Sequence, residues 1–195
     1  METLSSVLRC PIKNMWAASL DLKDAYLHVP ILPQHQRWLR FQVQGQTYQF
    51  RCLPFGLSTA PRVFTLIVRA VAAFLRRKGV NLCTYLDDWL IYGPSFRATA
   101  NQVKLTIEIV QRLGFLINGP KSSPIPTQLP SYLGAVLDLK EGKAYPSEDR
   151  KNNLVACVRI LLDSNAAPAL AWLKVLGIMA SMVDVIPMCR YHMRP

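Results

Sequence analysis

Alternation of apolar and polar residues predicts strands in several stretches of the chain. Residues 17–23 alternate as a half-buried strand would, and Asp21 falls on the polar face near the end of that strand. Residues 37–44 and 47–52 alternate on either side of Gly45-Gln46. This arrangement predicts a hairpin with a Gly-X turn.

A second hairpin is predicted over residues 81–92, where two adjacent acids, Asp87 and Asp88, interrupt an apolar run. Both flanks are rich in aliphatic and aromatic residues and are short enough to be strands, with the tight turn at residues 86–88. Neighbouring side chains of a straight strand point to opposite faces, so only a turn lets both carboxylates reach one spot beyond the sheet. An ordinary acidic turn is the alternative interpretation.

Apolar residues recur at helical spacing in two central stretches. The first helix opens at Ser58 and Thr59 and closes at Gly79, and the second opens at Ser95 and closes at Gly114. Each helix therefore offers one apolar face to the strands. The positions expected on those faces are Phe64, Ile67, Val71 and Leu75 in the first helix and Val103, Ile107, Val110 and Leu113 in the second.

Shorter elements are expected after the second helix. Residues 115–117 predict a short strand, and residues 118–130, with four prolines, predict a loop. Residues 131–137 and 143–145 flank Glu141-Gly142 and predict another hairpin.

The last fifty residues predict two amphipathic helices, at residues 154–162 and 170–179. Residues 166–186 are the most hydrophobic segment, but charged residues and prolines interrupt it, which favours a buried helix over a membrane span. A boundary near residue 146 divides the chain into domains at 1–146 and 147–195.

The chain is strongly basic, with 23 Lys and Arg against 12 Asp and Glu, a formal charge of +11 and a pI near 9.7. Such a charge indicates a polyanionic partner, most often nucleic acid, and an ordinary basic surface is the alternative. With 195 residues, 51% of them hydrophobic, the chain can bury a core. Four of its acids form two pairs, Asp21 with Asp24 and Asp87 with Asp88.

The five cysteines are scattered, with no C-x-x-C motif and no histidine at ligand spacing. They predict reduced core thiols rather than a zinc site or a disulfide framework. Residues 1–19 lack the apolar stretch of a signal peptide. An intracellular location is expected, while the choice between nucleus and cytoplasm and the oligomeric state are left open.

Asp21 precedes Asp87 by 66 positions (87 minus 21), which is too far for a local turn but compatible with neighbouring strands of one sheet. Three carboxylates that converge at a sheet end in a basic chain fit a two-metal site for phosphoryl transfer. Mg²⁺ prefers oxygen ligands, so we expect two Mg²⁺ ions, with Mn²⁺ as an alternative.

Four stretches of residues 19–137 resemble successive motifs of reverse transcriptases and follow the family's order. They are SLDLKDAYLHVPI at 19–31, LPFGLSTAP at 53–61, YLDD at 85–88 and SYLG at 131–134. The likeness is strongest to polymerases of LTR-type retrotransposons, in particular the DIRS-like elements that carry a tyrosine recombinase. It is weaker to telomerase or group II intron enzymes.

The resemblance implies an α+β fold: a right-hand polymerase palm with an antiparallel sheet backed by helices, partial fingers and the start of a helical thumb. It also implies an RNA-directed DNA polymerase, a nucleotidyltransferase that uses deoxynucleoside triphosphates and an RNA or DNA template with a DNA primer. No membrane partner is expected.

By matching motif positions, the resemblance assigns Asp21, Asp87 and Asp88 as catalytic metal ligands. The carbonyl of Leu22 is available as a further oxygen. Lys121 matches the family lysine that protonates the pyrophosphate leaving group, a role that suits an ammonium near a triphosphate.

Four residues are assigned to the incoming nucleotide in the same way. Tyr26 falls at the steric-gate position, where a ring would clash with a ribose 2′-hydroxyl, and a core tyrosine is the alternative. Asp24 and Ala25 lie along the nucleotide in relatives, and Asp24 could instead cap its turn. Phe55 stands where retroviral enzymes carry Gln, so its contact with the nucleotide would be by packing.

The motif Tyr132-Leu133-Gly134 would belong to the primer grip, a hairpin that holds the primer end against the metals. The last two helices would start the thumb, whose cations contact the duplex backbone without reading sequence.

Two features of the family are expected to be incomplete. Only twenty residues precede Asp21, so the segment that grips the triphosphate is mostly missing. No ribonuclease H motif follows, which predicts a fragment of a polyprotein that also carries that activity. Two alternatives stay open: an inactive nucleic-acid-binding remnant, and an RNA-dependent RNA polymerase palm, against which Tyr26 argues.

Overall fold

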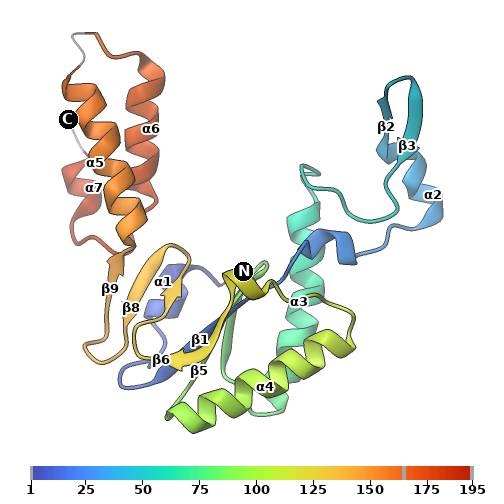
Figure 1. Cartoon of the computed structure of the whole chain (residues 1–195), viewed down its shortest axis with the longest axis horizontal. Coiled ribbons are helices and arrows are strands. Elements are labelled where there is room, and N and C mark those ends of the chain that lie inside the picture. Colours follow the sequence, from blue (N-terminus) through green and yellow to red (C-terminus); the bar gives the residue numbers. More distant parts are fainter. Residues whose placement is uncertain (1, 164–165, 194–195) are drawn as a thin grey trace.

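The computed structural model describes residues 2–163 and 166–193 of the chain. Its centre is a four-stranded sheet in which every pair of neighbouring strands is antiparallel. In spatial order the strands are β4 (Leu82–Tyr85), β5 (Asp88–Gly93), β1 (Trp16–Asp21) and β6 (Ser123–Thr127). Two helices, α3 (Ala60–Arg77) and α4 (Phe96–Arg112), cover one face of this sheet (Figure 1). The expected antiparallel sheet backed by helices is confirmed.

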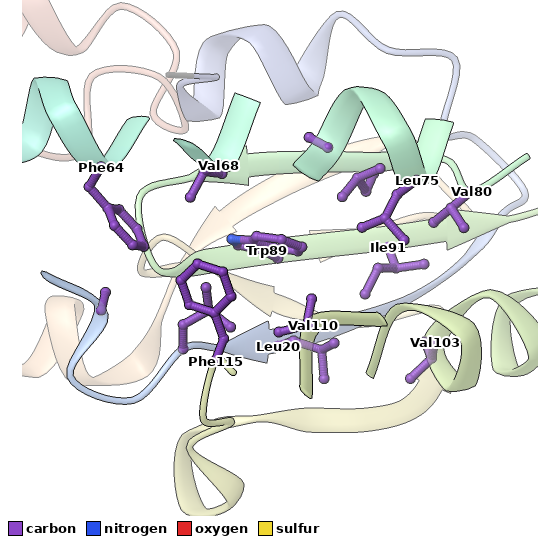
Figure 2. Close-up of a cluster of buried hydrophobic side chains, with 14 of the residues drawn as sticks. Leu20, Phe64, Val68, Leu75, Val80, Trp89, Ile91, Val103, Val110 and Phe115 are labelled. Atoms are coloured by element: carbon purple, nitrogen blue, oxygen red, sulfur yellow. The ribbon is translucent and has the colours of Figure 1, made fainter. Parts of the chain in front are cut away.

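The helix-covered face holds the larger hydrophobic core, which Figure 2 shows around Trp89. In α3, Phe64 and Leu75 are buried as predicted, but Ile67 and Val71 are only partly buried. The helix turns Val68 and Ala72 inward instead, so the predicted face was rotated by part of a turn.

The buried face of α4 was predicted correctly at two of its four positions. Val103 and Val110 are buried, but Ile107 is only partly buried and Thr106 is buried instead. Leu113 is 56% exposed because the helix ends at Arg112. Gly114 follows with a positive φ of 89°, the left-handed conformation that glycine adopts readily after a helix.

Strand β1 is covered on both faces, so the expectation of a half-buried strand is wrong. Its Leu20 faces α3 and α4, while its Ala17 packs on the other side in a second cluster with Tyr132. That second cluster also contains side chains of α1 (Leu4–Leu8). This cover leaves Asp21 only 8% exposed, although we expected it on a solvated face.

Strand β6 lies where a loop was expected, in residues 118–130, and it follows the 3-10 helix η3 (Gly119–Lys121). It pairs with β1 at the edge of the sheet, and an edge strand tolerates prolines because some of its N–H groups need no partner. The strand predicted at residues 115–117 is wrong. It is reduced to one bridge between Ile117 and Leu22.

A hairpin of β2 (Arg40–Val43) and β3 (Gln46–Gln49) projects away from the central sheet (Figure 1), and every residue of both strands is exposed. The predicted hairpin is confirmed, but its turn is centred on Gln44 and Gly45 rather than on Gly45-Gln46. Both turn residues have positive φ, as a type I′ turn requires. Three short helices precede the hairpin: η1 (Ala25–His28), α2 (Pro33–Gln36) and η2 (Arg37–Leu39).

A separate sheet follows β6, and it has three strands where we expected a simple hairpin. The strands are β7 (Ser131–Tyr132), β8 (Ala135–Asp138) and β9 (Lys143–Pro146). The additional turn is formed by Leu133 and Gly134, whose φ angles of 49° and 72° again fit a type I′ turn.

The chain then forms a helical arm of α5 (Glu148–Leu162), α6 (Ala169–Ala180) and α7 (Cys189–His192). The arm and the β2–β3 hairpin stand at opposite ends of the molecule (Figure 1). The two predicted amphipathic helices are confirmed. The expectation that residues 166–186 form a buried helix is wrong, because only Val175 of α6 is buried, against α5, while Trp172 and Leu173 are exposed.

Residue 2, in a segment without a clear sequence pattern, protects the edge strand β4. The amide of Glu2 donates to the carbonyl of Thr84, and its carboxylate accepts from the amide of Thr84 at 2.7 Å. The same carboxylate pairs with Arg76 at 2.7 Å, and Arg76 donates to the carbonyl of Leu82. These contacts occupy groups that an edge strand would otherwise leave open to another chain.

All five cysteines are free thiols, as predicted, but only three of them lie in the core. Cys10 and Cys52 are partly buried. Among the described residues, no helix combines the length and the apolar character needed to cross a membrane.

Candidate active site

Asp21 and Asp88 are brought together by strand register. The pairing of β1 with β5 sets the two residues directly opposite each other. Directly opposed side chains leave the same face of a sheet with their Cβ atoms about 4.5–5.5 Å apart. Register therefore places both carboxylates on the face away from α3 and α4.

Asp87 joins this pair through the turn between β4 and β5. Leu86 has a positive φ of 52°, and the indole N–H of Trp89 donates to the Leu86 carbonyl at 3.1 Å. The amide of Leu22 donates to the Asp87 carbonyl at 3.0 Å, so the turn is fastened to the chain that follows Asp21. The three predicted acids thus lie at one end of the sheet.

The other side of Asp21 is held by the segment around η3. The Asp21 amide donates to the hydroxyl of Ser122 at 2.9 Å, and its carbonyl accepts from the amide of Asn118 at 2.8 Å. These bonds bring Lys121 to the carboxylates, although a hundred positions separate it from Asp21 (121 minus 21). Ser122 was missed by the sequence reasoning because a serine in a proline-rich stretch carries no signal of its own.

The site gathers three carboxylates beside Lys121. Burial, followed by the carboxylates of Asp87 and Asp21, raises the pKa of Asp88 to about 6, and Lys121 opposes this shift. Burial also raises the pKa of Asp87; its own backbone N–H and Lys121 oppose that rise, and Asp21 adds to it. A cavity of about 130 Å³ is lined by Asp21, Asp88 and Lys121 together with residues of the β7–β8 turn.

The donor set fits divalent metal ions of the Mg²⁺ class. Within residues 2–163 and 166–193, no three His, Cys, Asp or Glu side chains are already arranged to ligate one ion. Asp21, Asp87 and Asp88 nevertheless supply oxygen donors only, which is what Mg²⁺ prefers. Burial, and after it the repulsion from Asp87 and Asp21, raises the pKa of Asp88, and a cation between the carboxylates would relieve that repulsion.

We expect Asp88→Asn to stabilise the folded chain at about pH 7.5 in a chelating buffer. An acid whose pKa is raised on folding binds its proton more tightly in the folded state, so ionisation costs stability as the pH rises from about 4 to 6. The difference from the parent should therefore vanish near pH 4. Urea unfolding at both pH values measures it, and a variant that is less stable than the parent at pH 7.5 would contradict the shift.

Tyr26 lies between the carboxylates and the core. Its ring centroid is 5.1 Å from that of Phe55 and 5.5 Å from that of Phe64. Burial, then the charges of Asp87 and Tyr85, raises the pKa of Tyr26, which places the phenol beside the acidic turn. Phe55 is 63% exposed, so the pair presents an aromatic surface near the acids.

The two residues that precede Tyr26 differ in burial: Asp24 is exposed and Ala25 is buried. Asp24 is exposed, with φ of 51°, and its side chain makes no capping hydrogen bond, so the alternative that it caps its turn is not supported. The side chain of Ala25 is buried in the core, which leaves only its backbone for contact with a ligand.

The turn between β7 and β8 lies directly against the acids. The buried hydroxyl of Tyr132 donates to the carbonyl of Asp88 at 3.1 Å, and burial is the main cause that raises the pKa of this phenol. Leu133 and Gly134 line the cavity that contains Asp21 and Asp88. All three residues of the predicted primer-grip motif are therefore beside the acidic cluster.

Comparison with known proteins places these motifs in a family. A model of the family "Reverse transcriptase (RNA-dependent DNA polymerase)" matches residues 2–137. Protein P of duck hepatitis B virus (strain China) is 31% identical over 157 residues, which cover 80% of this chain and 20% of that protein. The Gag-Pol polyprotein of woolly monkey sarcoma virus is 28% identical over 149 residues, which cover 72% of this chain and 9% of the polyprotein.

The fold is also found among solved structures. A foamy viral protease-reverse transcriptase in complex with an RNA/DNA hybrid aligns with a TM-score of 0.72 over 86% of this chain and 21% of that one, at 16% identity. This similarity confirms the fold, which is that of a partial polymerase palm. The chain spans about a fifth of the length of the curated hepadnaviral relative that it matches.

Proposed function

This chain belongs to the reverse transcriptase family, and we propose that it forms the catalytic palm of an RNA-directed DNA polymerase. The observation that carries the proposal is the register that sets Asp21 opposite Asp88, with Asp87 in the adjoining turn. Three acids at one end of the sheet suit nucleotidyl transfer, because they can hold the metal ions that neutralise the negative charge of the triphosphate.

Asp21, Asp87 and Asp88, with the carbonyl of Leu22, would hold two Mg²⁺ ions, or Mn²⁺ in their place. Such ions, when bound, lower the pKa of an attacking hydroxyl and neutralise the triphosphate. Lys121 lies close enough to the acids to lower the pKa of Asp87 and Asp88, a position from which its ammonium can give a proton to the departing pyrophosphate.

The charge distribution supports a nucleic-acid partner. Residues 25–86 contain no Asp or Glu but carry eight Arg or Lys residues, and they include the exposed β2–β3 hairpin and α3. We propose that this basic region meets an RNA or DNA template that is paired with a DNA primer, through contacts to phosphates that do not read sequence.

We propose further that the chain derives from an LTR-type or DIRS-like retrotransposon, within a polyprotein that includes ribonuclease H. The support for this origin is the likeness of the four motifs alone. We also propose that residues 1–146 act as palm and partial fingers and residues 147–195 as the start of the thumb, inside the cell.

The test is Mg²⁺-dependent extension of a DNA primer on an RNA template with deoxynucleoside triphosphates. Extension that stops on chelation is expected. Duplex binding without extension would favour the inactive remnant, and extension of an RNA primer with ribonucleotides would favour an RNA polymerase.

Tyr26→Ala is expected to lower the preference for deoxynucleotides over ribonucleotides by at least about tenfold, equivalent to 1.4 kcal/mol. The ring of Tyr26 is supported by Phe55 and Phe64 and lies beside Asp87, and we propose that the sugar of the nucleotide packs against it. The ratio of kcat/KM for the two sugars measures the effect. Tyr26→Phe keeps the ring and should keep the preference, and an unchanged ratio in Tyr26→Ala would remove the gate assignment.

A further inference from the structure

Arg150 occupies the junction between the helical arm and the acidic site. It lies in the first turn of α5, where its amide donates to the hydroxyl of the cap residue Ser147. The amide of Ser147 in turn donates to the carbonyl of Gly134 at 3.2 Å. The arm therefore begins directly on the β7–β8 turn.

The guanidinium of Arg150 fills the space above that turn. A Cβ atom added to Gly134 would overlap the Cζ, Nε and Nη2 atoms of Arg150, so the group lies against the bare glycine backbone. On its far side, Nη1 donates to the carbonyl of Ser181 at 3.1 Å. One planar side chain thus joins the β7–β8 turn to the residues that follow α6.

The turn held in this way lies next to the acids. Leu133 and Gly134 line the 130 Å³ cavity together with Asp21, and both also line a cavity of about 460 Å³ that contains Asp88 and Arg150. A shift of this turn would therefore change the position of the end of a primer strand that is bound against Asp88.

An ion pair does not explain the placement of Arg150. Asp184 lines the same 460 Å³ cavity, but the salt bridges within 4.0 Å among residues 2–163 and 166–193 include neither Arg150 nor Asp184. The contacts that Arg150 does make are with backbone atoms of two separate elements. Those contacts need the flat, forked shape of a guanidinium, which a lysine lacks.

We infer that Arg150 is a positioning residue that braces the Leu133-Gly134 turn against the helical arm and so sets where the primer end lies relative to Asp88. This inference rests on the proposed polymerase function. It predicts that loss of the brace weakens the productive binding of template–primer more than it slows the chemical step.

A double-mutant cycle with Arg150→Ala and Gly134→Asn tests the brace. Asn tolerates the left-handed conformation of Gly134, but its side chain must displace the guanidinium. Each single change should raise the KM for template–primer about tenfold, and the double variant should be no worse than Arg150→Ala. In Arg150→Ala, the kcat at saturation should stay within about twofold, and the melting temperature should stay near that of the parent.

Three further measurements separate a brace from other roles. Arg150→Lys should not restore the KM, because an ammonium cannot lie flat against Gly134 and also reach Ser181. The slope of log Kd against log salt for an RNA/DNA duplex should be unchanged in Arg150→Ala, since a lost phosphate contact would reduce it by about one. Arg97→Gln, an exposed cation at the far end of β5 from Asp88, is the matched control and should leave KM unchanged.

The inference is overturned by additive effects in the cycle, by rescue with Lys, or by a reduced salt slope. These outcomes require that the parent binds the duplex, so they are distinct from failure of the proposed function. A parent chain that neither extends a primer nor binds a duplex would overturn both.

Discussion

Asp87→Asn is expected to abolish primer extension, with kcat at least about 10³-fold lower, because the loss of several kcal/mol of charge stabilisation has that effect on rate. The change keeps the shape of the side chain but removes the charge that faces Asp21 in the acidic turn. Affinity for an RNA/DNA duplex should stay within about twofold of the parent, since cations elsewhere on the chain carry that binding. Single-turnover extension and fluorescence anisotropy measure the two quantities.

The control for this change is Asp163→Asn, which removes an exposed carboxylate at the end of α5. It should leave both extension and duplex binding unchanged. If Asp87→Asn extends primers at a rate near that of the parent, Asp87 does not act as a metal ligand. The proposed set of carboxylate ligands would then be reduced to Asp21 and Asp88.

Trp89→Ala is expected to lower the free energy of unfolding by about 3–5 kcal/mol, which is the usual range for a large aromatic residue removed from a core. Trp89 is 1% exposed and lies in the centre of the core between the side chains of α3 and α4 (Figure 2). The truncation also removes the hydrogen bond from the indole to the carbonyl of Leu86. Urea unfolding followed by far-UV circular dichroism measures the loss.

Two variants divide this effect into its parts. Trp89→Phe keeps most of the buried area but loses the bond to Leu86, so it should cost less than the alanine change while loosening the turn that carries Asp87. Trp38→Ala removes a tryptophan that is 72% exposed and should change stability by less than about 0.5 kcal/mol. A loss below about 1 kcal/mol in Trp89→Ala would mean that the core around it is less tightly packed than the structure indicates.

The acidic hairpin could be predicted from sequence because local signals agreed with one another. Two short apolar runs around an acidic pair allow few other structures, and the hairpin forms as expected. Its turn is one residue shorter than predicted, because Asp87 lies in the turn whereas Asp88 is already the first residue of β5. The convergence of these acids with Asp21 followed from the assumption that residues 17–23 form a neighbouring strand, and the register of β1 and β5 agrees with it.

Elements that depend on distant partners were predicted poorly. Strand β6 contains Pro124 and Pro126, and only its pairing with β1 makes it a strand. The burial of Asp21 depends on a second layer that is built from α1 and the β7–β9 sheet. The alternation of apolar and polar residues along β1 does not indicate that this layer exists. The role inferred for Arg150 depends on its contacts with Gly134 and Ser181. The sequence around Arg150 does not predict these contacts.

The central position of β1 has a consequence for synthesis of the chain. Both of its partners, β5 and β6, are translated later, and β6 begins 102 positions after Asp21 (123 minus 21). At about 5–20 residues per second, the edge of β1 that pairs with β6 stays unpaired for roughly 5–20 s. A ribosome that pauses between the codons for residues 22 and 127 would therefore hold the sheet incomplete, with an edge of β1 open to aggregation.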